Sequence, residues 1–391
     1  MKVAVAGYGS RGDIEPLAAV GRELFRRGHD VRTAVPVNLL GFVGSAGLPA
    51  VGYGLDPDAR GPEDFVQNFV HNGRLLDPMT AMTQHFTRAM AEWGAALTSV
   101  ADGADLLLTC ANEQGLAANV AEYYGIPLAT VHFLPGGPSR PGGLIGCIVK
   151  DAEDTQRRAL GLSEAPGTPA SLEIRAYDEF CFPGPAAQSS GGRQHFVGAL
   201  TLELPTAADA EVLSWIADGT PPIYFGFGSN IQVWHAAQLA ALMSAVCAEL
   251  GERALICSGV SDFTGAPGFD HVKVVGAVNH AAVFPACRAV VHHGGAGTTA
   301  AGMRAGIPTL ILWSEVDDQP IWAAAVERLK VGAGRAFPNI SQASLVADLR
   351  SILTPQCLAR AREVAADMTT AAESAARAAD LLEEAVRRAD A

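Results

Sequence analysis

An apolar run, a glycine-rich turn and a helix follow one another near residue 290, and this order limits the fold more than any other feature. Residues 289–291 are apolar, residues 292–297 read His-His-Gly-Gly-Ala-Gly, and Thr298 and Thr299 open an alanine-rich helix. A buried strand that leads through a glycine turn into a helix is the building unit of parallel, doubly wound sheets. The segment therefore predicts an α/β fold.

The same turn predicts an anion site. The first N–H groups of a helix have no backbone partner and lie at the positive end of the helix dipole, so they bind phosphate groups. Two imidazoles and two hydroxyls beside them add hydrogen-bond donors without a permanent charge. This combination suits a nucleotide diphosphate that has to be held and later released.

Length and charge narrow the possible functions. The chain has 391 residues, which favours two domains, and 49% of the residues are hydrophobic while 18% are charged, as in a globular protein. The net charge of −13 argues against a general binder of nucleic acid or of anionic membranes. Any phosphate site must therefore be built locally, from helix dipoles and a few donors.

Cysteine usage and hydropathy bear on the compartment. The seven cysteines are scattered and show no C-x-x-C spacing, which argues against a zinc site and a disulfide framework. The N-terminal apolar run is too short for a signal peptide, and no stretch is long enough for a membrane span. We expect a cytoplasmic protein without stable membrane insertion.

Two halves of the chain repeat the alternation of strands and helices. We expect strands at 2–6, 30–37, 105–109, 128–132, 222–228, 253–258, 272–275, 289–291 and 309–313. We expect helices at 15–27, 114–124, 236–250 and over nearly all of 341–391, with loops at 134–143, 165–168 and 182–194. This pattern predicts two doubly wound domains that meet near residues 200–220, with a ligand in the cleft between the carboxyl ends of their sheets.

Residues 7–12 match the dinucleotide-binding fingerprint G-x-G-x-x-G, but their surroundings do not. That fingerprint requires an acidic residue at the end of the second strand, where residues 35–38 read Val-Pro-Val-Asn. Asp13 directly after the last glycine would repel a pyrophosphate, so a dehydrogenase is disfavoured. Asp13 can simply favour the start of its helix, or it can take a proton from a hydroxyl nucleophile.

Four sequence blocks resemble the GT-B fold glycosyltransferases, and most closely the bacterial enzymes that glycosylate natural products such as the vancomycin-group glycopeptides. This UDP-glycosyltransferase-like family implies two Rossmann-like domains with a cleft between them. The blocks are residues 9–16 (GSRGDIEP), 224–229 (YFGFGS), 292–299 (HHGGAGTT) and 318–320 (DQP).

The resemblance implies a reaction and a set of roles. Asp13 would be the general base for inverting transfer of a hexosyl group from a dTDP- or UDP-sugar to a hydroxyl of an apolar small molecule, peptide or lipid. His293 would contact the diphosphate, and Asp318 and Gln319 would hold the sugar hydroxyls. The implied donor-binding residues are Ser10, Arg11, Gly12, Ser229, Val278, His293, Gly295, Gly297, Thr298, Asp318 and Gln319.

The resemblance also assigns the domains. Residues 1–205 would bind the acceptor and residues 220–375 the nucleotide sugar. Residues 376–391 would form a C-terminal helix, for which the first domain is a candidate packing surface. The family's stacking residues for the base, Trp and Gln, are missing around Val278, so only its backbone is a candidate for base contact.

No cofactor and no metal is expected. The glycine turn has no D-x-D-like metal clamp beside it, and Asp317 and Asp318 are neighbours whose side chains point apart on an extended segment. The acceptor candidates are His132, at the end of a strand, and the helically spaced Phe69 and Met79. A stripe of that kind more commonly belongs to a core.

Alternatives remain for single residues and for the whole protein. His293 can be an ordinary helix-start histidine, His292 can simply pack, and Asp318 can be an N-cap before Pro320. A sugar-nucleotide epimerase or hydrolase of the same fold is an alternative, disfavoured by Asp13 as the sole base in its loop because epimerisation needs further carboxylates around the sugar. A non-catalytic homologue would have lost Asp13 or the His293 turn. A monomer and a homodimer are both compatible with the sequence.

Overall fold

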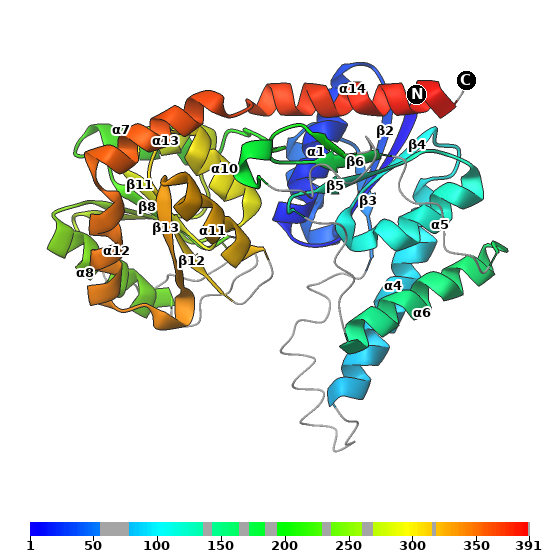
Figure 1. The fold of residues 1–391 in the computed structure, drawn as a ribbon, viewed down its shortest axis with the longest axis horizontal. Helices are drawn as coiled ribbons and strands as arrows, with labels where there is room; N and C mark the ends of the chain where they lie inside the picture. Colours follow the sequence, from blue (N-terminus) through cyan, green and yellow to red (C-terminus); the bar gives the residue numbers. More distant parts are fainter. Residues whose placement is uncertain are drawn as a thin grey trace. The chain divides into compact units, whose positions relative to one another are not determined.

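The computed structural model describes residues 1–54, 78–135, 143–163, 172–183, 194–228, 236–259, 269–314 and 318–389. The chain forms two compact units, drawn in Figure 1. The first comprises Met1–Ala176, Gly184–Leu202 and Ala372–Ala391, and the second Tyr177–Pro183 and Glu203–Ala371. Helix α14 (Ala371–Ala389) thus belongs almost entirely to the first unit.

The first unit contains a parallel sheet of seven strands in the order β3-β2-β1-β4-β5-β6-β7. Buried apolar side chains such as Val5 and Leu108, which pair across β1 and β4, form its centre. The strands are β1 (Lys2–Ala6), β2 (Asp30–Val35), β3 (Ala50–Gly52), β4 (Leu106–Cys110), β5 (Leu128–His132), β6 (Leu172–Arg175) and β7 (Gln194–Phe196). Its helices are α1 (Arg11–Arg26), α2 (Leu40–Ser45), α4 (Pro78–Val100), α5 (Gln114–Tyr124), α6 (Gly143–Ala159) and α14, with 3-10 turns η1 (Val37–Leu39) and η2 (Ala111–Glu113).

The second unit repeats this winding with six parallel strands in the order β10-β9-β8-β11-β12-β13. The strands are β8 (Ile223–Gly226), β9 (Ala254–Cys257), β10 (Val272–Val275), β11 (Ala289–His292), β12 (Thr309–Trp313) and β13 (Gly332–Ala336). Its helices are α7 (Asp209–Ala217), α8 (Ala236–Leu250), α9 (His280–Val283), α10 (Ala296–Arg304), α11 (Gln319–Leu329), α12 (Gln342–Ile352) and α13 (Pro355–Asp367), with 3-10 turns η3 (Glu179–Cys181), η5 (Phe284–Ala286) and η6 (Phe337–Asn339).

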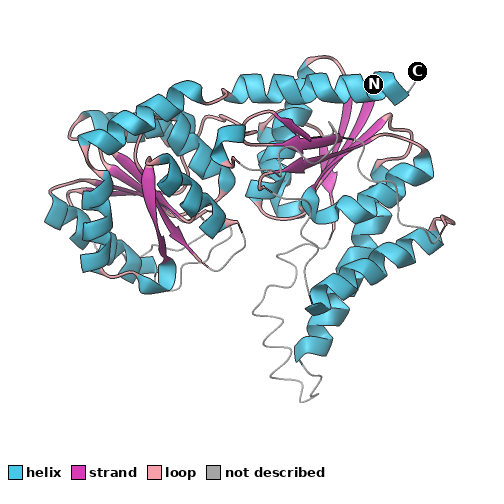
Figure 2. Ribbon diagram, viewed as in Figure 1, coloured by secondary structure: helices cyan, strands magenta, loops and turns pink. Residues whose placement is uncertain are grey.

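The expected α/β class is confirmed, and Figure 2 shows helices around each magenta sheet. In both units the chain moves outward from the first strand to one edge and then returns to place its fourth strand on the other side. β1 is therefore flanked by β2 and β4, and β8 by β9 and β11. The loops after β1 and β4, and after β8 and β11, consequently lie at the two points where ligands bind in such sheets.

Two helices begin earlier than the sequence indicated. Helix α1 starts at Arg11 instead of residue 15, because the Ser10 side chain caps it and Asp13 completes a capping box. Helix α10 starts at Ala296 instead of Thr298, because the Thr299 N–H already bonds to the Gly295 carbonyl at 3.0 Å. Both shifts extend the helix toward the glycines of its turn.

The C-terminal helix α14 packs on the first unit through an apolar face and a charged edge. Ala378, Ala379 and Leu382 are fully buried. Arg27, at the end of α1, donates to Asp380 at 2.6 Å and to Glu383 at 3.2 Å. None of the helices in the described residues is both long and apolar enough to cross a membrane.

Candidate active site

Asp13 lies at the switch point of the first sheet, in the first turn of α1. Its Oδ2 accepts hydrogen bonds from the Ser10 N–H at 2.7 Å and from the Ser10 hydroxyl at 3.0 Å. Its Oδ1 accepts one from Nδ2 of Asn112 at 3.2 Å. Since a carboxylate oxygen has two lone pairs, Oδ1 keeps acceptor capacity for a further proton.

The electrostatic surroundings of Asp13 favour a base over a permanently stabilised anion. Burial raises the pKa of its carboxyl above the usual value, and the hydrogen bonds from Ser10 and Asn112 work against that shift. A raised pKa makes a carboxylate a stronger proton acceptor. Helix capping and proton transfer are thus compatible roles for the same side chain.

Ser10 and Arg11, which were also predicted from this loop, make hydrogen bonds and ion pairs with neighbouring residues. The Ser10 hydroxyl accepts from the Gly12 N–H at 3.2 Å while it donates to Asp13. The Arg11 side chain pairs with Glu15 at 3.0 Å and lies over the Phe42 ring, 4.5 Å from its centre. Their contribution to donor binding stays a prediction.

Asn112 and Glu113 were not anticipated from the sequence. They belong to the turn η2 that follows β4, and β4 pairs with β1, so this turn and the Asp13 loop share one switch point. Asn112 also donates to the Tyr8 carbonyl at 3.4 Å. The signal that could have found them is their position directly after the strand that neighbours β1 in a doubly wound order.

His293 lies at the corresponding switch point of the second sheet, directly after β11. Its ring rests against the backbone of Gly228, and a Cβ placed on Gly295 would come within 2.6 Å of its Nε2. Gly295 is the N-cap of α10, so Nε2 faces the start of that helix. Gly295 is thus required by the close approach of the imidazole.

An uncharged imidazole and free helix N–H groups come together here. Burial lowers the pKa of His293 to about 4, against an interaction with the Gly226 backbone that raises it. Gly297 and Thr298 occupy the first turn of α10, whose N–H groups have no partner within the helix. Binding of a diphosphate at this helix start stays a prediction.

The neighbouring His292 is part of the core. It is fully buried, burial lowers its pKa well below the usual value, and its Nδ1 accepts from the Gly294 N–H at 3.1 Å. It therefore stabilises the turn through packing and this hydrogen bond.

Gln319 reaches the same turn from helix α11. A Cβ on Gly294 would come within 3.2 Å of the Gln319 Cα, which shows how closely the helix start approaches the turn. The Gln319 carbonyl oxygen accepts from both the N–H and the hydroxyl of Ser314, at 2.7 and 3.0 Å. Gln319 is 5% exposed, and its contact with sugar hydroxyls stays a prediction.

Asp318 and Val278 differ in their structural surroundings. Asp318 occupies the N-cap position of α11 with Pro320 in the first turn, as predicted, although its side chain makes no capping hydrogen bond. Val278 is 6% exposed and packs in the core of the second unit. Any contact of Val278 with a base would therefore involve its backbone.

The acceptor candidates are only partly described. His132 is buried, with 4% of its surface exposed, and burial together with the charge of Arg175 lowers its pKa to about 3. Met79 lies in the first part of α4, where the backbone alone is described. Phe69 and the donor-site candidate Ser229 lie outside the described residues. The structure thus leaves the acceptor site a prediction.

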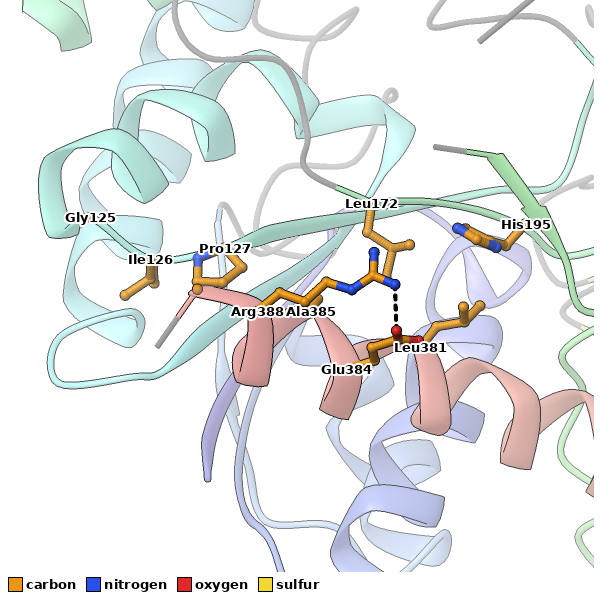
Figure 3. A pocket seen from close by; sticks show the side chains of 10 residues that line it. Gly125, Ile126, Pro127, Leu172, His195, Leu381, Glu384, Ala385 and Arg388 are labelled. Atoms are coloured by element: carbon orange, nitrogen blue, oxygen red, sulfur yellow. Dashed lines mark hydrogen bonds and ion pairs between the residues drawn. The ribbon is translucent and has the colours of Figure 1, made fainter. Parts of the chain in front are cut away.

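A cavity of about 450 Å³ lies in the first unit, away from Asp13. Figure 3 shows Leu172 and His195, from β6 and β7, opposite Glu384 and Arg388 on α14, which pair with each other. Pro127 and Leu172 stand at the amino ends of β5 and β6, whereas Asp13 follows the carboxyl end of β1. None of the predicted site residues lines this cavity.

Known proteins resemble the chain along its whole length. A protein-family model for the C-terminal domain of erythromycin biosynthesis protein CIII-like proteins matches residues 239–384. An uncharacterised glycosyltransferase of Mycobacterium tuberculosis (strain ATCC 25618 / H37Rv) is 56% identical over 420 residues, which cover 100% of each chain. The vancomycin aglycone glucosyltransferase of Amycolatopsis orientalis is 31% identical over 422 residues, covering 99% of this chain and 98% of its own.

The fold has a counterpart of known structure. The glycosyltransferase VinC, solved in complex with dTDP, superposes with a TM-score of 0.70 at 19% identity, over 100% of both chains. Both doubly wound units thus recur in a solved glycosyltransferase. The chain belongs to the natural-product glycosyltransferase family with the GT-B fold.

Proposed function

We propose that this glycosyltransferase moves a hexosyl group from a dTDP- or UDP-sugar to a hydroxyl group of an apolar acceptor, with inversion at the anomeric carbon. The acceptor is a small molecule, a peptide or a lipid, and no metal takes part. The observation that carries the proposal is Asp13, a carboxylate with a raised pKa and spare acceptor capacity at a switch point of the fold.

In this reaction Asp13 takes the proton of the acceptor hydroxyl. The acceptor oxygen forms a bond to the anomeric carbon while the bond from that carbon to the diphosphate oxygen breaks, and its electron pair leaves with the diphosphate. His293 and the N–H groups of Gly297 and Thr298 would stabilise the growing negative charge. The dTDP bound by the related VinC supports a nucleotide donor for this chain.

The alternatives have less support. Epimerisation needs further carboxylates around the sugar, and in this proposal Asp13 and Asp318 are the acids assigned to reactant contacts. A non-catalytic homologue would lack Asp13 or the His293 turn, and both are present. Transfer with a base on the first unit and a donor site on the second therefore remains the best-supported function.

Calorimetric titration of the full chain with dTDP and UDP, in buffer that contains EDTA, tests the donor site. We expect at least one nucleotide to bind under these conditions. Binding of neither nucleotide, or binding only after magnesium replaces EDTA, would contradict the proposal. A screen of hydroxylated acceptors with the corresponding nucleotide sugar then tests transfer itself.

A further inference from the structure

Glu113 is a buried acid that the proposed reaction does not use. It closes the turn η2, and its side chain points into the unit, 1% exposed. Its Oε2 accepts from the Thr109 hydroxyl at 3.1 Å and from the Cys110 thiol at 3.3 Å. Its Oε1 is buried and has no hydrogen-bond partner among the described residues.

Among the described residues, the titratable groups that interact electrostatically with Glu113 are an acid, two phenols and a thiol. Asp13 faces it from α1, Tyr8 from the loop after β1, Tyr53 from the loop after β3, and Cys110 from β4. A carboxylate that is 1% exposed and lies among these groups is poorly stabilised as an anion. The site therefore favours the uncharged acid.

The titration of Glu113 follows from these surroundings. Burial raises its pKa to about 8, the hydrogen bonds from Cys110 and Thr109 and the Tyr8 backbone oppose this, and the charge of Asp13 raises it further. At neutral pH most molecules therefore carry a protonated Glu113. In turn, Glu113 contributes to the raised pKa values of Tyr8, Tyr53 and Cys110.

Asn112 connects Glu113 to Asp13. It precedes Glu113 in the same three-residue turn, and its Nδ2 donates to Oδ1 of Asp13. A charge on Glu113 is better stabilised when water reaches Oε1, and opening of the turn would admit that water. Such a movement withdraws the Asn112 donor from Asp13.

We propose that Glu113 is a positioning residue of the transferase: as an uncharged acid it keeps the turn closed and Asn112 on Asp13, and its ionisation limits activity at alkaline pH. The activity part of this inference rests on the proposed function of Asp13. The protonation of Glu113 and its coupling to Asp13 do not.

Infrared difference spectroscopy tests the protonation directly. The spectrum of the wild type minus that of Glu113→Gln should contain the C=O band of a protonated carboxylic acid at neutral pH. This band should disappear with a midpoint near 8. In an Asp13→Asn background the midpoint should fall, because the charge of Asp13 no longer opposes ionisation. Glu249→Gln, which removes an exposed carboxyl group, serves as the control.

The second readout is the pH profile of kcat/KM, each variant being normalised to its own plateau. It is measured as nucleoside diphosphate release from dTDP-glucose or UDP-glucose with an accepted hydroxyl compound. We expect the wild type to lose at least half of its plateau activity as the pH passes the midpoint of about 8. Glu113→Gln should keep its plateau over the same range.

Two results would overturn the inference. One is the absence of the protonated-acid band at neutral pH, and the other is an alkaline decline that is the same in the wild type and in Glu113→Gln. If Glu113→Gln does not fold, the ionisation of Glu113 is followed instead through ¹³C-labelled glutamate carboxyls in the wild type and in Asp13→Asn. Failure of the proposed function is recognised separately, because Asp13→Asn would then retain activity whatever the state of Glu113.

Discussion

Asn112 donates a hydrogen bond from its Nδ2 to Oδ1 of Asp13 at 3.2 Å, across 99 residues of sequence. The two residues meet because β4 returns to pair with β1 after the chain has formed β2 and β3. The donor lies on a turn and the acceptor in the first turn of a helix, so the topology of the sheet itself orients the base.

We predict that Asn112→Ala weakens catalysis and shifts its pH dependence. Its hydrogen bond lowers the pKa of Asp13, so its loss raises that pKa, and the acid limb of the kcat/KM profile moves to higher pH. Removal of one hydrogen bond to a charged group corresponds to a decrease of roughly tenfold or more in kcat/KM. Asn339→Ala, at an exposed asparagine of the second unit, is the control. An unchanged acid limb in Asn112→Ala would show that this bond does not act on the base.

Gly295→Ala should reduce nucleotide affinity without unfolding the protein. The new Cβ would lie 2.6 Å from Nε2 of His293 and displace the ring from the start of α10. We expect the Kd for dTDP or UDP, whichever the wild type binds, to rise roughly tenfold. This change corresponds to the loss of one good hydrogen-bond donor. Gly41→Ala adds a Cβ that meets nothing within 4 Å and controls for the substitution. Equal affinities of the two variants would refute the assignment of His293.

Gln319→Glu separates the loop role of Gln319 from its sugar role. Glutamate keeps an oxygen that can accept from Ser314 but has no NH₂ donor. We therefore expect KM for the nucleotide sugar to rise by roughly tenfold more than the Kd for the free nucleotide, which the added negative charge beside the turn also raises. A matching loss of affinity for the free nucleotide would mean that the substitution disturbs the whole turn.

Glu113 should make the unfolding free energy fall as the pH rises. Because burial raises the folded-state pKa from 4.5 to about 8, the folded state holds a proton that the unfolded state releases, so stability is lost between these two values. Relative to the wild type, Glu113→Gln should gain about 1.4 kcal/mol for each pH unit in that interval. Urea unfolding of both proteins at several pH values measures this difference. A constant difference across the interval would indicate that Glu113 is ionised throughout.

Most of the strands could be predicted from the sequence because buried parallel strands are short apolar runs, but β3, β6, β7 and β13 were not expected. Residues 128–132 and 309–313 were predicted with the bounds that the structure gives to β5 and β12. The starts of α1 and α10 were placed too late, since apolar periodicity begins only after the first turn. At α1 the cap contacts of Ser10 and Asp13 fix the start.

The candidate site was predictable only where residues of one loop act together. The His293 turn and the Asp13 loop are contiguous motifs. Asn112 and Glu113 act on Asp13 through the pairing of β1 and β4, which depends on the order of strands in space. His132 stands at the end of a strand as expected, yet its exposure depends on packing around it, which the sequence pattern does not show.

The central claim is that Asp13 is the general base. The most direct test compares Asp13→Asn with the wild type in two measurements on the same preparation: turnover of the nucleotide sugar with an accepted hydroxyl compound, and calorimetric binding of the nucleoside diphosphate. We predict that nucleotide affinity is unchanged while turnover falls by about a hundredfold or more. Turnover close to that of the wild type would contradict the account.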